Sequence, residues 1–180
     1  MAATLREFLP TIIFLAKFLG IYLVASLFYG AYVTSFEPGP DPATRAVAQQ
    51  TSIALGVCGW DTSVHDNAEK PTTEVALDGK DILSIYEGCN GINVMIIFLA
   101  FLLAFGPINR WLWWYIPVGL CILHVSNLLR ITILFWVSLN EPDFMYFLHK
   151  YFFTAALYVV TFILWVIWVR MYMRTKVVKA

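Results

Sequence analysis

Long runs of apolar residues, separated by shorter polar stretches, dominate the chain. The runs cover residues 18–36, 91–106, 111–139 and 149–169. A helix needs about 20 predominantly apolar residues to cross a hydrocarbon core about 30 Å thick. The pattern therefore predicts an all-α integral membrane protein with about four transmembrane helices. The second run is the shortest, and taken alone it is also compatible with a re-entrant segment.

The stretches between these runs complete a single membrane domain over residues 1–180. Residues 1–17 carry Arg6, Glu7 and Lys17 among apolar residues, so we expect them in the cytoplasm or in the membrane interface. The other stretches are an outer segment (37–90), a short inner loop (107–110), an outer loop (140–148) and a basic inner tail (170–180).

The outer segment has its own signals of secondary structure. Asp41 precedes a proline in the pattern of a helix N-cap, which predicts a short helix through about Leu55. The dipeptide Asp78-Gly79 separates Glu74–Leu77 from Asp81–Tyr86, and this arrangement is typical of a β-hairpin. Two strands alone are marginally stable in water. We therefore expect a small outward α+β segment, a short helix plus a β-hairpin, that packs on the helices or on lipid.

Composition supports a membrane protein and excludes several other classes. Sixty per cent of the residues are hydrophobic and 13% are charged, against roughly half and a quarter in a typical soluble domain. An ordinary soluble enzyme, a disordered chain and a collagen-like repeat are therefore excluded. The net charge is zero, so the basic surface typical of nucleic-acid binding is not expected.

The positions of the charges predict the topology. Nine acidic residues and three basic ones lie between Glu37 and Glu87, whereas Arg110 and the segment from Arg170 to Lys179 are basic. Lys and Arg residues near membrane ends favour the cytoplasmic side. We therefore expect both termini inside, and the outer segment and outer loop on the opposite face.

Three chemically reactive side chains are predicted to meet at that outer face. Cys89 directly precedes the second run, and His149 opens the fourth. Arg130 is 19 residues after Trp111, about 28 Å along a helix that starts inside. Ionisable groups within membrane segments are costly and are functional candidates by default. The span arithmetic thus places Cys89, Arg130 and His149 at one depth.

These residue types suit acyl transfer. A thiolate is the nucleophilic form of cysteine, and a nearby cation or a helix N-terminus lowers the pKa of the thiol. Histidine serves as base toward the thiol and as acid toward a leaving amine. The fixed donors of arginine bind an oxyanion or a carboxylate. Asn127 lies one turn before Arg130 on the same helix face, and Asn90 and Gly91 allow a sharp turn after Cys89.

Other interpretations of these residues remain open. Cys89 is also compatible with simple packing, or with a disulfide to Cys58 in an oxidising compartment. Arg130 and His149 are also compatible with anchoring at lipid headgroups. His124, about two turns before Arg130, is a second candidate for the general base. The alternative functions are a thiol–disulfide oxidoreductase and a scaffold subunit without enzymatic activity. No His, Cys and carboxylate set has metal-ligand spacing, so we expect no metal and no other cofactor.

Three ordered motifs in this sequence resemble the exosortase/archaeosortase family. They are Glu87-Gly88-Cys89-Asn90-Gly91-Ile92, then Asn127-Leu128-Leu129-Arg130-Ile131, and then His149. The family has a Cys-x-Gly motif, an Asn-x-x-Arg motif and a later His, each at the outer end of a membrane helix. The resemblance covers roughly residues 80–170, and the chain looks most like the compact exosortase F branch.

The resemblance implies a function, a location and partners. It implies a membrane cysteine protease or transpeptidase that cleaves C-terminal sorting signals through a thioester on Cys89, with Arg130 and His149 completing the catalytic set. Asn127, Asn90 and Gly91 are then expected to bind or orient the substrate. The implied partners are secreted proteins whose signal comprises a motif, a membrane helix and a basic tail. The implied location is the bacterial plasma (inner) membrane, with a multi-pass chain and an active site on the outer, periplasmic face.

Overall fold

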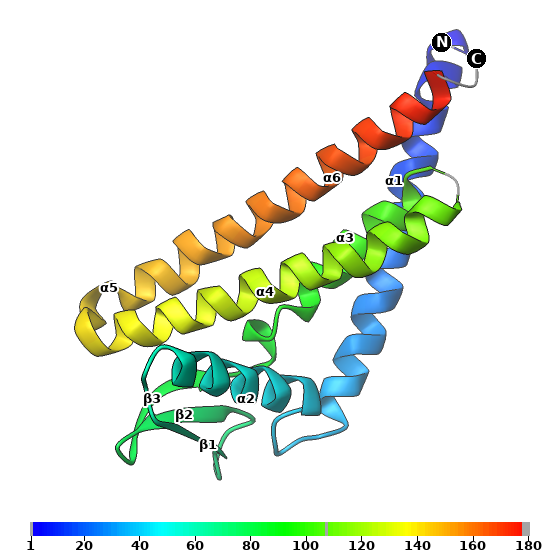
Figure 1. Ribbon diagram of the computed structural model, residues 1–180. Coiled ribbons are helices and arrows are strands. Elements are labelled where there is room, and N and C mark those ends of the chain that lie inside the picture. Colours follow the sequence, from blue (N-terminus) through cyan, green and yellow to red (C-terminus); the bar gives the residue numbers. More distant parts are fainter. Residues whose placement is uncertain (1, 107, 178–180) are drawn as a thin grey trace.

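The computed structural model describes residues 2–106 and 108–177, which form a bundle of long helices above a small layer of helix and sheet (Figure 1). The elements in chain order are α1 (Ala2–Thr34), α2 (Pro42–Val57), β1 (Thr62–Asp66), β2 (Thr73–Leu77), β3 (Lys80–Ile85), the 3-10 turn η1 (Glu87–Cys89), α3 (Ile92–Ala104), α4 (Arg110–Asn140), α5 (Pro142–Phe147), the π-helical turn η2 (Leu148–Phe152) and α6 (Phe153–Val177).

Three candidate membrane spans are present in the described residues, where we expected four. They are Glu7–Thr34, Arg110–Asn140 and Pro142–Met173. The expected second span is α3, an apolar helix of 13 residues, or about 20 Å in length. That length is less than a hydrocarbon core of about 30 Å. Phe105 caps this helix, and Gly106, with φ 93°, comes next, a left-handed conformation that glycine favours and that turns the chain here.

Several predicted boundaries differ from the helices observed. We expected the first span to begin at residue 18 after an interfacial stretch, but α1 is continuous from Ala2 and includes Pro10. The expected inner tail from residue 170 is helical as far as Val177. Predictions that fall on Met1, residue 107 or residues 178–180 lie outside the described part of the chain.

The outer loop predicted at 140–148 is largely helical. Pro142 occupies the first position of α5, where proline's fixed φ favours a helix and its missing N–H costs nothing. This short helix continues through η2 into α6 without an intervening coil. The π-helical turn adds one residue to a turn of the helix, because its backbone hydrogen bonds span five residues instead of four. This turn contains His149.

The predicted helix and hairpin of the outer segment are both present. The Asp41 side chain accepts the backbone N–H groups of Ala43 and Thr44 at the start of α2. Asp78 and Gly79 both have positive φ, 52° and 77°, as a two-residue hairpin turn of this type requires. A third strand, β1, pairs antiparallel with β2 to give the order β1-β2-β3, and the sequence analysis missed it.

Two hydrophobic cores hold these layers together. In the outer layer, α2 covers the sheet and both pack against the last turns of α4, through buried residues that include Val75, Ile85 and Phe135. A second core lies between α3, α4 and α6, around Phe98 and Trp168. The hairpin is thus stabilised by the helices, as expected for a sheet too small to be stable alone.

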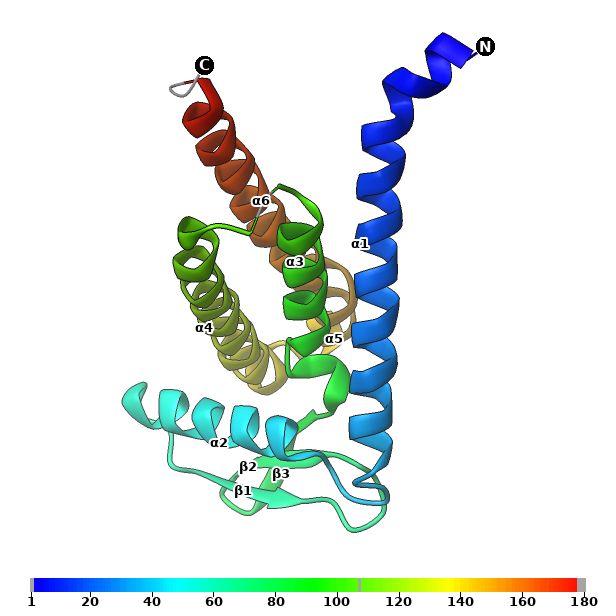
Figure 2. The same ribbon diagram turned by 90° about the vertical axis from the view of Figure 1, so that its right-hand side faces the viewer.

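The helices differ in how much protein surrounds them. α1 stands at one side of the molecule and packs on α3 (Figure 2), where Phe14 makes edge contacts with Phe101 and Phe105. In the most apolar 18-residue segment of α1 none of the residues is buried inside the protein, whereas 39% are buried in the corresponding segment of α4. Both termini lie at the same end of the molecule, and α2, α5 and the sheet lie at the other (Figure 1).

Candidate functional site

A short turn between the sheet and the third helix carries Cys89. Tyr86 alone separates β3 from the turn η1, and the Cys89 N–H donates to the carbonyl of Tyr86 at 2.8 Å. Cys89 is buried, with 4% of its surface exposed. Gly91 then takes φ 82° as the N-cap of α3, a left-handed conformation that glycine adopts without a Cβ penalty.

Asn90 attaches this turn to the first two helices. Its Nδ2 donates to the hydroxyl of Tyr29 on α1 at 2.7 Å and to Thr44 Oγ1 on α2 at 3.2 Å. Its Oδ1 accepts the N–H of Ile92 at 3.0 Å. With 1% of its surface exposed, Asn90 has partners for both polar atoms of its amide, as a buried amide requires.

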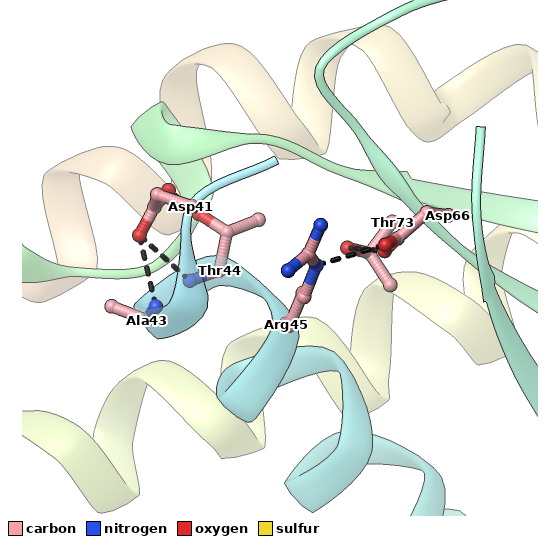
Figure 3. A network of polar contacts seen from close by, with 6 residues as sticks. All are labelled: Asp41, Ala43, Thr44, Arg45, Asp66 and Thr73. Atoms are coloured by element: carbon pink, nitrogen blue, oxygen red, sulfur yellow. Dashed lines mark hydrogen bonds and ion pairs between the residues drawn. The ribbon is translucent and has the colours of Figure 1, made fainter. Parts of the chain in front are cut away.

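The helix that carries Thr44 is itself fixed by a polar network (Figure 3). Thr44 Oγ1 donates to Asp41 Oδ2 at 2.5 Å, so the N-cap of α2 and the partner of Asn90 belong to one network. The next residue, Arg45, forms an ion pair with Asp66 of β1, with Nε and Oδ2 2.8 Å apart. Thr73 of β2 donates to the same carboxylate at 3.1 Å. The start of α2 is therefore tied to two strands as well as to the Cys89 turn.

Asn127 attaches the turn to α4 from the opposite side. Its Nδ2 donates to the carbonyl of Cys89 at 2.9 Å, and its Oδ1 accepts Nη1 of Arg130 at 3.3 Å. A Cβ placed on Gly91 would lie 3.0 Å from Asn127 Cγ. The left-handed φ and this close approach both favour glycine at position 91.

Arg130 brings an uncompensated positive charge into the site. It is 8% exposed, and its Nε has no hydrogen-bond partner in the described structure. The ion pairs found in residues 2–106 and 108–177 are Arg45–Asp66 and His65–Asp81, and neither includes Arg130. A buried guanidinium with spare donors is well suited to bind an anion or a developing negative charge.

His149 completes the group from the η2 turn. Its Nε2 lies 3.9 Å from Cys89 Sγ, a contact between residues 60 positions apart in the chain. Its Nδ1 is buried and has no hydrogen-bond partner among the described residues. The structure thus brings together Cys89, Arg130 and His149, and it places Asn127, Asn90 and Gly91 around the backbone of the Cys89 turn.

Burial raises the pKa of the Cys89 thiol, and the charge of Arg130 offsets this only in part. A nearby cation lowers the pKa of a thiol, but burial has the larger effect here because it disfavours the charged thiolate. Cys89 therefore rests as a thiol, and the group that removes its proton must lie close to it. Nε2 of His149 has that position.

A cavity of about 270 Å³ opens beside these residues. Its lining includes Gly88, Asn93, Arg130, His149 and Thr154. The cavity lies between the Cys89 turn, α3, α4 and the start of α6, so a chain bound there would pass the guanidinium of Arg130 and the ring of His149.

His124, the second candidate for the general base, and Cys58, the candidate disulfide partner of Cys89, make other contacts or none of the expected ones. His124 Nε2 is hydrogen-bonded to Gln50 Oε1 of α2 at 2.7 Å. Cys58 and Cys121 are free and exposed, and Cys89 is free and buried. The disulfide between Cys58 and Cys89 is therefore not formed. Among the residues described, no group of three or more His, Cys, Asp or Glu side chains is arranged to hold a metal ion.

Three residues that shape the site, Tyr29, Thr44 and Tyr86, could not be singled out from the motifs in the sequence. Tyr29 and Thr44 bind Asn90, and Tyr86 lies beside Cys89 and His149. Tyr29 belongs to an apolar run and Thr44 to an amphipathic helix, so nothing local distinguishes them. Tyr86 was placed in the second strand of the hairpin, and its position directly before the Glu87-Gly88-Cys89 motif was the available signal.

Comparison with known proteins gives one match. A family model described as transmembrane exosortase matches residues 8–166. No curated protein and no solved structure matches the chain.

The raised pKa of Cys89 predicts a specific pH dependence of alkylation. In a Cys58→Ser/Cys121→Ser variant, Cys89 is the remaining thiol. We expect its reaction with iodoacetamide to be slow at neutral pH and to keep accelerating beyond about pH 8.5, the pKa of a free cysteine. The measurement is the rate constant from mass-detected labelling across pH. A plateau reached below neutral pH would instead show a thiolate–imidazolium pair at rest.

Proposed function

The chain belongs to the transmembrane exosortase family, and on this basis we propose that it is a membrane cysteine peptidase or transpeptidase that removes C-terminal sorting signals from exported proteins. We further propose that it is a compact, exosortase F-like member, which its size and its outer segment support. Family membership and the apolar helices make it a multi-pass membrane protein.

The contact between Cys89 Sγ and His149 Nε2 carries this proposal. A packing cysteine has no need of an imidazole beside it, and an interfacial histidine has no need to place its ring against a buried cysteine. Arg130 adds a buried cation with an unpaired Nε next to this pair. Nucleophile, base and oxyanion donor are the three groups that acyl transfer requires.

The reaction follows from these positions. The Cys89 sulfur attacks the carbonyl carbon of the scissile peptide, and its proton passes to Nε2 of His149. The S–C bond forms, and the carbonyl oxygen becomes an oxyanion that Arg130 binds. When the tetrahedral intermediate collapses, the C–N bond breaks and His149 returns the proton to the leaving amine. The product is a thioester on Cys89, which an amine or water then resolves.

Asn127, Asn90 and Gly91 act as positioning residues in this mechanism. Asn127 binds the carbonyl of Cys89 and the guanidinium of Arg130 at once, so it sets their relative position. Asn90 and Gly91 fix the backbone that follows the nucleophile. Positioning within a fraction of an ångström is a large part of catalysis by oriented groups.

The proposed topology has four crossings, with α3 as a short second one. Both termini lie at one end of the molecule, which requires the chain to return between α1 and α4 (Figure 1). The basic residues near the termini favour the cytoplasm for that end. The acidic outer segment and the Cys89 turn would then face outward, on the periplasmic side of the bacterial inner membrane. Substrates would be exported proteins held there by a motif, a membrane helix and a basic tail.

Paired cysteine variants test the function. The protein is co-expressed with secreted proteins that carry such a C-terminal signal, and loss of the signal is scored by mass. We expect Cys89→Ser to abolish cleavage, and Cys58→Ser, at matched membrane abundance, to cleave like the wild type. Equal dependence of the activity on both cysteines would support a disulfide oxidoreductase instead. Cleavage that persists in Cys89→Ser would exclude Cys89 as the nucleophile.

Arg130→Lys tests the oxyanion role. Lysine keeps the positive charge but replaces a planar set of donors by a point charge on a flexible stem. Loss of one preorganised oxyanion donor costs about 2.7–4 kcal/mol, roughly a hundred- to a thousandfold in rate. We therefore expect Arg130→Lys to insert and fold normally and to cleave almost as poorly as Arg130→Ala. Cleavage close to wild type in the lysine variant would leave Arg130 as an anchor at the headgroups.

A further inference from the structure

Tyr86 is fixed directly beside the nucleophile. Its carbonyl accepts the N–H of Cys89 at 2.8 Å. Its ring lies over Gly88, where an added Cβ would overlap Cε2 of the tyrosine. Gly88, which directly precedes Cys89, therefore leaves room for the tyrosine ring, which occupies the space that a side chain would take.

The Tyr86 side chain also lies close to the side chains of Cys89 and His149. It approaches the side chain of Cys89 closely enough for the two to influence each other's pKa. The Tyr86 ring also lies 6.5 Å from the ring of His149, centroid to centroid. Tyr86 is 40% exposed and lines the same cavity as Arg130 and His149. It thus lies between the Cys89 turn and the cavity beside Arg130 and His149.

We propose that Tyr86 is a further catalytic residue, whose hydroxyl donates a hydrogen bond to the Cys89 sulfur while that sulfur carries negative charge. This inference rests on the proposed function. The charge appears when the thiol proton passes to His149, and again when the thioester is resolved and the C–S bond breaks. The phenol keeps its own proton throughout, so it takes no part in the bond changes.

The chemistry of the site explains why such a donor is useful. A buried sulfur loses the water that would stabilise its anion, and the Arg130 guanidinium in this mechanism is committed to the oxyanion. A donor that remains neutral can stabilise the thiolate without adding a second cation. Tyr86 meets this condition. The negative charge of a Cys89 thiolate, and to a smaller extent burial, raise the pKa of the Tyr86 hydroxyl above that of an ordinary tyrosine.

A packing role is the alternative, since an aromatic ring over a glycine also shields the turn from solvent. Tyr86→Phe separates the two, because it keeps the ring and removes only the hydroxyl. Tyr32→Phe is the matched control. Tyr32 lies on α1, where its ring contacts Tyr29 and Phe36.

The test uses the full chain in the Cys58→Ser/Cys121→Ser background. A hydrogen bond to a charged group changes an equilibrium about tenfold or more, which is about one pH unit. We expect Tyr86→Phe to raise the pH midpoint of Cys89 alkylation by about that amount, and to slow removal of the sorting signal about tenfold. Tyr32→Phe should change neither quantity.

Each other result has a defined meaning. Slower cleavage with an unchanged alkylation midpoint would assign Tyr86 a structural role and overturn the inference. A raised midpoint with unchanged cleavage would overturn it as well, because the bond would not matter to the reaction. Failure of the background protein itself to cleave any sorting signal would reject the proposed function, while the alkylation shift would still report the hydrogen bond to Cys89.

Discussion

Two buried amides, Asn90 and Asn127, hold the turn that carries Cys89, and the other contacts of the site depend on that turn. Asn90 joins it to α1 and α2, and Asn127 joins it to α4. A buried polar group left without its partner costs about 1–3 kcal/mol, so the two amides hold the turn in place from opposite sides. Because Asn127 also binds Arg130, the Cys89 turn and the guanidinium are positioned by one side chain.

Much of this arrangement can be predicted from the sequence, because a membrane restricts where helices begin and end. Counting residues along apolar runs places Cys89, Arg130 and His149 at one end of the bundle, where the structure brings them together. Local turn chemistry is equally direct: Asp41 caps α2, and Asp78 begins the hairpin turn. In both cases the outcome depends on a few adjacent residues or on helix length alone.

The remainder depends on contacts that no local pattern encodes. Strand β1 contains a single strongly apolar residue, Val64, and is defined mainly by its pairing with β2. The π-helical turn that contains His149 lies at the junction of α5 and α6, both of which contact it. Burial of Cys89 arises from a core assembled by distant segments, and it reverses the pKa shift that the neighbouring cation alone would give.

A covalent intermediate on Cys89 is the central claim, and intact-mass analysis of the protein during turnover tests it most directly. Reaction with a tail-bearing substrate is quenched in acid, and the protein is then mapped by proteolysis. The account predicts an acyl adduct on Cys89 that hydroxylamine removes, with the C-terminal signal released in equal amount. Release of the signal without any adduct on Cys89, or with the adduct on another residue, would contradict it.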